Sequence, residues 1–212
     1  MKVCLVGAGG LVGSHLLDYL KKEETIESIL CLSRRDSFSV GKVQNLKIDF
    51  EKISELNLSQ IDVLFCCLGT TIKVAGNKEA FKKVDYDYVI EFGNLAKKYA
   101  IPKFLVVSAM GVDSKSFLFY NQIKGQMEES LHSLELRSLQ IFRPSLLIGE
   151  RKEFRLGEKI GEILGGIFSF AFIGELKKFK PIEAKKVALS MFNHSLHNSD
   201  PFLIIESDEM ND

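Results

Sequence analysis

Residues 2–22 read KVCLVGAGGLVGSHLLDYLKK, in which a short apolar run ends in a glycine cluster and leads directly into a helical pattern. A strand, a tight glycine turn and a helix start are what a dinucleotide diphosphate requires. Glycine lets the backbone approach the phosphates, and the helix N-terminus offers free N–H groups. The alternative is a tight turn in a sheet that binds nothing. The candidate contacts are Gly7, Gly9, Gly10, Leu11, Val12 and Gly13.

Short apolar runs recur along the rest of the chain, at residues 27–33, 45–49, 62–69, 103–108, 137–142 and 201–206. Helical patterns separate several of them, and the clearest has apolar residues at steps of three or four: Phe81, Val84, Tyr88, Phe92, Leu95 and Tyr99. Strands that are apolar on both faces and alternate with helices indicate a parallel sheet covered on both sides. We therefore predict a doubly wound, mostly parallel α/β domain of the NAD(P)-binding Rossmann type over residues 1–212. The part from about residue 150 is expected to complete a substrate pocket.

The composition is that of an ordinary soluble globular protein, with 46% hydrophobic and 26% charged residues. The balance of 28 basic against 28 acidic residues gives no electrostatic reason to expect a nucleic-acid partner. The most apolar window, residues 163–174, is shorter than the roughly 20 residues that cross a bilayer as a helix, so no transmembrane segment is expected. The four histidines show no metal-binding spacing, and we expect no metal site.

The cysteines lie in apolar runs and do not form the paired spacing of a zinc or redox motif. We interpret them as reduced core residues, which predicts a protein of a reducing compartment and, with no secretory signal in residues 1–10, a cytoplasmic location. They are Cys4, Cys31, Cys66 and Cys67.

Ser33, Arg34 and Arg35 end the second predicted strand. An acidic residue at this place would accept hydrogen bonds from the ribose of NAD, whereas arginines hold the additional 2′-phosphate of NADP. The pair therefore favours NADP(H) over NAD(H), and the alternative is a pair of surface arginines. Further candidate contacts end the next two predicted strands: Asp49 for the adenine, and Leu68, Gly69 and Thr70 along the cofactor.

A tyrosine and a lysine four residues apart occur twice, as Tyr99 with Lys103 and as Tyr120 with Lys124. Pro102 disfavours a helix through the first copy, so Tyr99 closes a helix and Lys103 opens a strand. The second copy lies in a proline-free helical pattern, which brings both side chains to one face, one turn apart. Only the second copy is a candidate catalytic pair.

Hydride transfer combined with proton transfer is the chemistry that suits this pair. A carbonyl reduced by a nicotinamide needs a proton at its oxygen, and a tyrosine supplies it if its pKa, ordinarily about 10, is lowered. A lysine charge about 4 Å away contributes about 4 kcal/mol at an effective dielectric constant near 20, so we expect Lys124 to lower the pKa of Tyr120. Ser108, at the end of the fifth predicted strand, is expected to bind the substrate oxygen. A serine hydrolase is disfavoured, because Val106 occupies the first glycine position of a G-x-S-x-G elbow.

With these motifs the chain resembles the short-chain dehydrogenase/reductase superfamily. VDYDYVIEFGNLAKKYAIPKFLVVSAMG, FLFYNQIKG and IFRPSLLIGER are similar to its compact atypical group of Tat-interacting-protein-like NAD(P)H-binding proteins. The resemblance extends to about Arg151 and implies Ser108, Tyr120 and Lys124 as the catalytic set, with Lys124 also on the nicotinamide ribose. It further implies that the segment after RPS continues beside the nicotinamide. Many extended members carry asparagine where Asp85 stands.

Three functions stay open at this point: an NADP(H)-dependent oxidoreductase with an unknown carbonyl or alcohol substrate, an NADP(H)-binding sensor that acts on a protein partner, and a nucleotide-sugar epimerase. The third is disfavoured because the long substrate domain of such members is absent. Gly157, Gly161 and Gly165 recur every fourth residue and would give a helix a smooth face for packing, for a homodimer contact or for the pocket lining.

Overall fold

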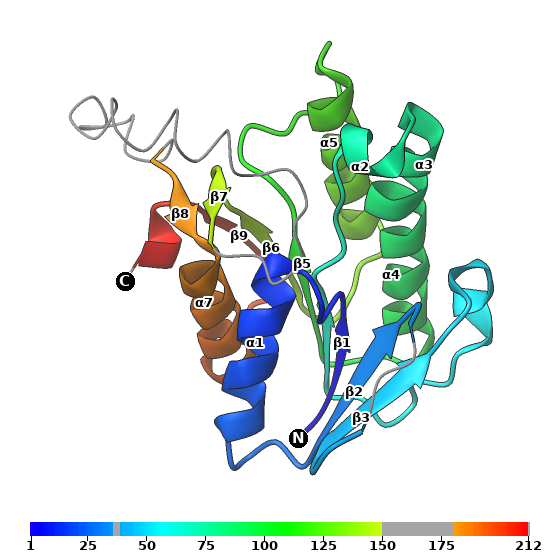
Figure 1. Ribbon diagram of the computed structural model, residues 1–212, viewed down its shortest axis with the longest axis vertical. Helices are drawn as coiled ribbons and strands as arrows, with labels where there is room; N and C mark the ends of the chain where they lie inside the picture. Colours follow the sequence, from blue (N-terminus) through cyan, green and yellow to red (C-terminus); the bar gives the residue numbers. More distant parts are fainter. Residues whose placement is uncertain (36–38, 150–179, 212) are drawn as a thin grey trace.

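The computed structural model describes residues 1–35, 39–149 and 180–211 (Figure 1). Its centre is a seven-stranded sheet in the order β3-β2-β1-β4-β5-β6-β9, with every neighbouring pair parallel. Each of the seven predicted apolar runs overlaps one of its strands, so the predicted parallel sheet is confirmed. The strands are β1 (Lys2–Val6), β2 (Ser28–Ser33), β3 (Val43–Lys47), β4 (Val63–Cys66), β5 (Lys103–Val107), β6 (Leu139–Arg143) and β9 (Phe202–Glu206).

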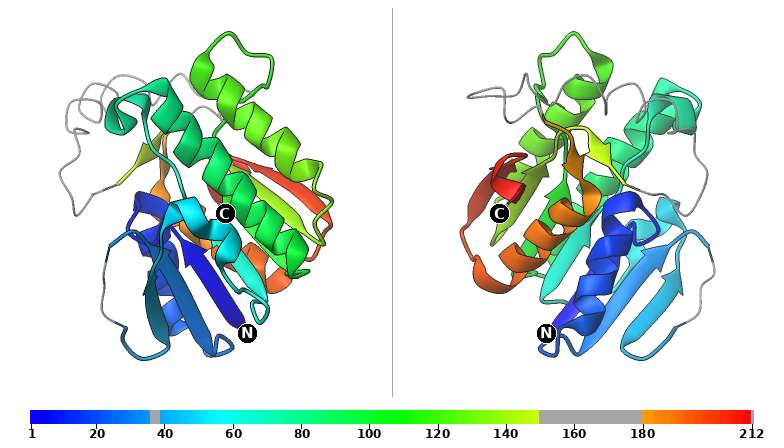
Figure 2. Two further views of the ribbon diagram at one scale, coloured as in Figure 1. Left: turned by 90° about the vertical axis from the view of Figure 1, so that its right-hand side faces the viewer. Right: turned by 60° about the vertical axis from the view of Figure 1, so that its left-hand side comes forward.

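Helices cover both faces of this sheet (Figures 1 and 2). One face carries α1 (Leu11–Lys22) and α7 (Ala184–His197), and the other carries α4 (Tyr88–Lys98) and α5 (Phe119–His132). Side chains of β1 alternate between the two cores, with Leu5 in the first and Val6 in the second. Burying one leucine or phenylalanine side chain stabilises the fold by about 1.5–3 kcal/mol. Because the strands have a core on each face, apolar residues at successive positions are all stabilising. The short elements are η1 (Phe50–Glu55), α2 (Ile72–Ala75), α3 (Lys78–Lys82), β7 (Leu147–Ile148), β8 (Ile182–Glu183) and η4 (Glu209–Asn211).

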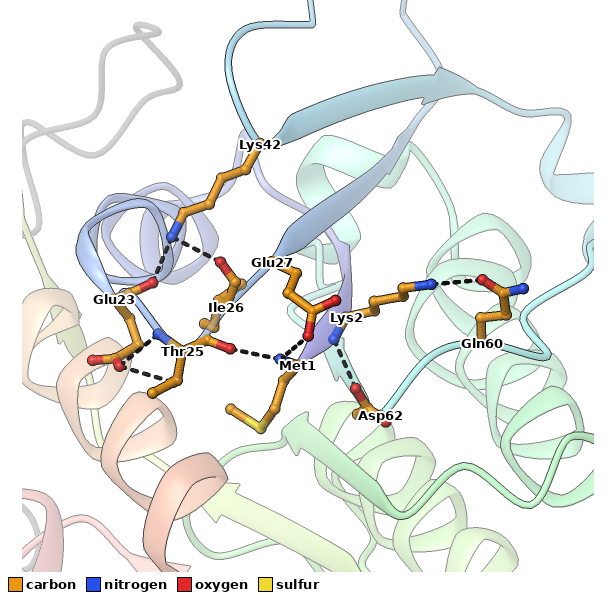
Figure 3. Close-up of polar contacts among 9 residues, drawn as sticks. All are labelled: Met1, Lys2, Glu23, Thr25, Ile26, Glu27, Lys42, Gln60 and Asp62. Atoms are coloured by element: carbon orange, nitrogen blue, oxygen red, sulfur yellow. Dashed lines mark hydrogen bonds and ion pairs between the residues drawn. The ribbon is translucent and has the colours of Figure 1, made fainter.

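Polar contacts join the strands at the amino edge of the sheet (Figure 3). The backbone N–H of Lys2 donates to Asp62 Oδ2 at 2.7 Å, and its Nζ donates to Gln60 Oε1 at 2.7 Å. On the other side of β1, Lys42 Nζ donates to the carbonyl of Ile26 at 3.1 Å, in the turn that follows α1. These contacts link the start of β1 to that of β4 and the start of β3 to that of β2, and leave the opposite, carboxyl edge to the candidate site.

The helix that precedes β5 contains a π turn, η2 (Lys83–Asp87), between α3 and α4. The predicted inward face included Val84 and Tyr88, but both are only half-buried, whereas Asp85 and Val89 are fully buried. Phe81, Phe92 and Leu95 are buried as predicted, and Tyr88 packs half-buried against the second core. The prediction was wrong at Val84: Asp85, four residues after Phe81, is buried there, so this helical face carries a carboxylate into the protein.

The part of the chain after residue 149 is described only from residue 180 onward. It adds α7 to one face of the sheet and β9 to its edge. The predicted glycine-lined helix around Gly157, Gly161 and Gly165 lies outside the described residues, as does most of the segment predicted to complete a pocket. Within residues 1–35, 39–149 and 180–211, no helix has the length and apolar character needed to span a membrane.

Candidate active site

The glycine turn after β1 lies flat against the end of β4. Gly7 has a φ of +86°, and a Cβ there would lie 2.5 Å from the carbonyl oxygen of Cys67. A Cβ at Gly13, in the first turn of α1, would lie 2.2 Å from the carbonyl oxygen of Gly7. Both contacts are shorter than any side chain tolerates, so these two positions require glycine. A Cβ at Gly9, by contrast, would meet no atom within 4 Å, which leaves an open face of backbone.

The N-terminus of α1 is suited to an anion. Gly10 is its N-cap and supplies no side-chain hydrogen bond. The first N–H groups of an α-helix have no intrahelical acceptor, and the helix dipole adds partial positive charge there. Leu11, Val12 and Gly13 form this first turn, directly beside the flat glycine loop. The cradle and the uncapped helix start fit the diphosphate of a dinucleotide.

The predicted contacts for the adenosine end have mixed environments. Arg34 and Arg35 are exposed beyond β2, and Ser33 Oγ donates to the carbonyl of Arg35 at 2.5 Å. β3 ends at Lys47 rather than at Asp49, and the Asp49 carboxylate accepts the N–H of Glu51 at 3.0 Å as the cap of η1. Asp49 is therefore engaged in local structure, while the arginines extend from the carboxyl edge.

Asp85 connects the loop after β4 to the π turn. The backbone N–H of Thr70 donates to Asp85 Oδ2 at 2.8 Å, and a Cβ at Gly69 would lie 3.6 Å from Asp85 Oδ1. Leu68, Gly69 and Thr70 are thus held at the carboxyl edge next to the glycine loop. Asp85 was noted in the sequence only because many extended members carry asparagine there, and it was assigned no role. A carboxylate within a largely apolar helical face could have indicated one.

Lys124 is the partner of Asp85 across the gap between α5 and the π turn. Its Nζ lies 2.9 Å from Asp85 Oδ1, and the exposed fractions of the two side chains are 3% and 1%. Burial is the largest single influence and lowers the pKa of Lys124, but the charge and hydrogen bond of Asp85, together with the charges of Tyr120 and Cys66, outweigh it and raise this pKa above its ordinary value. Lys124 is therefore a buried ammonium whose charge is largely compensated by one carboxylate.

Tyr120 lies one turn before Lys124, half-buried, with its ring centroid 5.4 Å from that of Phe81. Burial raises the pKa of Tyr120, the charge of Lys124 lowers it, and the charge of Asp85 raises it again; the net direction is upward. Lys124 lowers the pKa of Tyr120 as expected, but burial and the counter-ion Asp85, which the expectation omitted, outweigh the lysine.

Ser108 follows β5, and its backbone N–H donates to the carbonyl of Phe142 at 2.7 Å. Its hydroxyl donates to Glu128 Oε1 on α5, an acceptor that sequence reasoning missed. Glu128 is paired in turn with Arg143 at the end of β6, with 2.6 Å between Arg143 Nη2 and Glu128 Oε2. The hydroxyl predicted to bind a substrate oxygen thus has a carboxylate partner within the protein.

The side chains of the other tyrosine and lysine pair, Tyr99 and Lys103, bind different partners. α4 ends at Lys98, Tyr99 is its C-cap and Lys103 begins β5, as predicted. The Tyr99 hydroxyl donates to the carbonyl of Leu56 at 3.1 Å, whereas Lys103 Nζ donates to the carbonyl of Ser195 at 2.7 Å. Tyr120 and Lys124, by contrast, both face the helix before β5, where they meet Phe81 and Asp85.

The parallel sheet, the glycine cradle and a serine, tyrosine and lysine at the same edge define a Rossmann domain of the short-chain dehydrogenase/reductase class. The sequence profile of the semialdehyde dehydrogenase NAD binding domain matches residues 2–90. Protein HTATIP2 of Rattus norvegicus is 35% identical over 162 residues, which are 74% of this chain and 66% of that protein. The mitochondrial protein FMP52 of Candida albicans is 32% identical over 223 residues, which are 99% of this chain and 96% of that protein. The chain therefore belongs to the HTATIP2 and FMP52 family of atypical short-chain dehydrogenases/reductases.

Solved structures share the fold at low sequence identity. MoeE5 in complex with UDP-glucose and NAD superimposes with a TM-score of 0.69 at 15% identity, over 99% of this chain and 79% of that one. The UDP-glucuronic acid 4-epimerase from Bacillus cereus, in complex with UDP-glucuronic acid and NAD, gives a TM-score of 0.71 at 15% identity, over 97% and 77%. At this identity the likeness shows the fold alone.

The predicted cytoplasmic location is corrected by the relatives. Proteins from Candida albicans, Meyerozyma guilliermondii and Debaryomyces hansenii, aligned over more than nine-tenths of both chains, are all named as mitochondrial. The prediction rested on reduced cysteines and the absence of a secretory signal, and these properties suit any reducing compartment. In the described part of the chain, no group of three or more cysteine, histidine or acidic residues is arranged to hold a metal ion.

Proposed function

We propose that this chain is an NADP(H)-dependent oxidoreductase that reduces a carbonyl or oxidises an alcohol. The observation that supports it most is that Ser108, Tyr120 and Lys124 lie at the same sheet edge as the glycine cradle. The bound nicotinamide would supply or accept the hydride. The chain would bind and orient both reactants and move the accompanying proton.

Each group has a role that its surroundings support. The cradle of Gly7 and Gly13, with the first N–H groups of α1, would hold the diphosphate. Lys124 would donate a hydrogen bond to the nicotinamide ribose while its ammonium stays paired with Asp85. Tyr120 would exchange the proton with the substrate oxygen. The remaining proposed contacts are Gly9, Gly10, Leu11, Val12, Ser33, Asp49, Leu68, Gly69 and Thr70.

The preference for NADP(H) over NAD(H) rests on Arg34 and Arg35. Both are exposed at the carboxyl end of β2, next to the edge strand β3, where the adenosine ribose of a bound dinucleotide lies in this fold. A guanidinium pairs with a phosphate through two parallel hydrogen bonds, so the pair suits a 2′-phosphate.

Cofactor binding followed by turnover tests the proposal. Titration with the protein should change the fluorescence of NADPH, which reports binding. A panel of aldehydes, ketones and quinones should then be screened for NADPH oxidation. Tyr120→Phe should retain NADPH binding and lose on the order of a hundredfold in kcat, the lower end of general acid catalysis. If neither NADPH nor NADH binds, the proposal fails as a whole.

A second candidate is a protein that senses NADP(H) and turns over little. The raised pKa of Tyr120 and the compensation of Lys124 by Asp85 favour it, because a tyrosine must reach its ionised form to oxidise an alcohol. Tight NADPH binding, with the same residual turnover in wild type and Tyr120→Phe, would select this candidate.

The names of the fungal relatives also support a mitochondrial location for this chain, which subcellular fractionation tests.

A further inference from the structure

Glu128 lies on the same helical face as the candidate pair. Tyr120, Lys124 and Glu128 are spaced four residues apart on α5, so they form one row over two helical turns. Glu128 is buried, with 5% of its surface exposed. A buried carboxylate is costly unless it is paired and hydrogen-bonded, so the contacts of this one indicate what it does.

Arg143 fixes the orientation of Glu128 from the end of β6. Its Nε lies 3.1 Å from both carboxylate oxygens of Glu128, and its Nη2 lies 2.6 Å from Oε2. The remaining arm of the guanidinium, Nη1, donates to Glu206 Oε1 at 3.0 Å. Such a fork restricts both translation and rotation of a carboxylate, more than a lysine could. Glu128 therefore presents Oε1 in one fixed direction.

Ser108 donates its hydroxyl proton to that oxygen. A serine side chain has three staggered positions, and a charge-assisted hydrogen bond to a fixed acceptor selects one of them. A hydroxyl has one proton and two lone pairs, so a proton given to Glu128 leaves lone pairs for any other neighbour. Ser108 thus offers an acceptor, rather than a donor, to a second partner.

We propose that Glu128, held by Arg143, is a positioning residue for Ser108: it fixes the Ser108 oxygen as a hydrogen-bond acceptor that orients the hydroxyl of an alcohol as it binds, before that hydroxyl turns to Tyr120 for proton transfer. The inference rests on the proposed oxidoreductase function, because it assigns Glu128 a role only through the reaction at Tyr120. It extends the site from three residues to five, with Glu128 and Arg143 beneath the reacting groups.

A double-mutant cycle tests the proposal, with NADP⁺-dependent oxidation of benzyl alcohol and cyclohexanol as the probe reactions, because only an alcohol has a hydroxyl proton to donate to Ser108. NADPH oxidation by 9,10-phenanthrenequinone, aldehydes and ketones checks turnover in the reductive direction. Glu128→Gln should lower kcat about tenfold, the equivalent of one charge-assisted hydrogen bond, and leave the Kd of NADPH unchanged. In a Ser108→Ala background the same substitution should have no further effect on kcat, because the hydroxyl that it positions is gone. Arg143→Lys should also lower kcat, because it keeps the positive charge but removes the guanidinium that contacts both oxygens of Glu128.

Glu129→Gln is the matched control. Glu129 is the next residue of α5, exposed, and its Oε1 also accepts a serine hydroxyl, that of Ser114 at 2.5 Å. This variant should change kcat by less than about twofold, as surface substitutions do. Urea unfolding of every variant separates loss of folding from loss of function, and Arg143→Lys replaces Glu128→Gln if the latter does not fold.

The outcomes distinguish the two proposals. Equal losses from Glu128→Gln in the wild-type and Ser108→Ala backgrounds would show a structural role only and overturn the positioning role, while the oxidoreductase function stands. A wild-type chain that binds NADPH yet turns over none of the alcohol, quinone, aldehyde and ketone probes would overturn the oxidoreductase function and the positioning role with it.

Discussion

Lys124 Nζ lies 2.9 Å from Asp85 Oδ1, and both side chains are almost completely removed from solvent. Removing two charges from water costs several kcal/mol per ion, and mutual attraction offsets this only with good geometry. The second oxygen of Asp85 accepts the N–H of Thr70, which helps to satisfy the carboxylate. This pair joins α5, the π turn and the loop after β4 in one buried contact.

Breaking the pair from one side should destabilise the fold. Asp85→Leu leaves a buried ammonium without a counter-charge, and we expect the free energy of unfolding to fall by about 3–5 kcal/mol in urea titrations. Asp85→Leu combined with Lys124→Met should recover most of this loss, because no uncompensated charge remains. Asp87→Leu, in the same π turn but exposed, is the control. If both Asp85 variants are equally destabilised, the ion pair is not the cause.

The pH dependence of stability should report the same pair. The pKa of Lys124 in the folded protein is raised above its ordinary value of 10.5: burial, the largest single influence, opposes the shift, and Asp85 supplies the first of the charges that together outweigh it. A raised lysine pKa contributes stability that is fully present below 10.5 and is lost as the pH rises through the folded value. Urea midpoints of the wild type should therefore fall more steeply above this pH than those of Asp85→Leu/Lys124→Met. Parallel curves would argue against the assigned direction of the shift.

The glycine cradle predicts different effects at Gly13 and at Gly9. A methyl group at Gly13 would overlap the carbonyl oxygen of Gly7, a backbone atom that cannot move away freely, so Gly13→Ala should cost about 1–3 kcal/mol of stability and disrupt NADPH binding. Gly9→Ala meets no atom within 4 Å and should fold normally. Weaker NADPH binding by a stable Gly9→Ala variant would identify the open backbone as the phosphate contact. Unchanged binding by both variants would remove the cradle from the site.

The arginine pair predicts a cofactor-specific effect. Replacing Arg34 and Arg35 by alanine should weaken NADPH binding at least about tenfold, or 1.4 kcal/mol, and leave NADH binding nearly unchanged. The matched control is Lys97→Ala/Lys98→Ala, which removes two exposed positive charges at the end of α4. It should weaken neither cofactor, because its charges are screened by salt at distances beyond about 10 Å. Equal weakening of NADPH and NADH would contradict the 2′-phosphate role.

The two tyrosines that precede lysines allow a direct comparison. Tyr120→Phe should lose on the order of a hundredfold in kcat, whereas Tyr99→Phe should lose only the stability of one hydrogen bond to Leu56, about 1 kcal/mol, with normal turnover. Steady-state NADPH oxidation and urea unfolding measure the two effects. A comparable loss of kcat in both variants would mean that the position of Tyr120 has no special role.

Much of the fold follows from local patterns. Apolar runs marked all seven strands of the sheet, because strands buried on both faces carry apolar residues throughout. Pro102 correctly divided Tyr99 from Lys103, since proline restricts the backbone of the residue before it. The ends of elements were less certain: β3 stops at Lys47, and Asp49 caps η1.

The sequence by itself therefore determined the sheet, the glycine turn and the placement of Tyr120 and Lys124 on one helix, because these depend on residues close together in the chain. Only the tertiary structure decided their chemical environment. Asp85, in the π turn, faces Lys124, and the packing of α5 against β5 and β6 brings Glu128 to Ser108 and Arg143. Burial and the charge of Asp85 then raise the pKa of Tyr120, against the lowering by Lys124. Charges and desolvation act through space, so residues far apart in the sequence set the properties of the candidate pair.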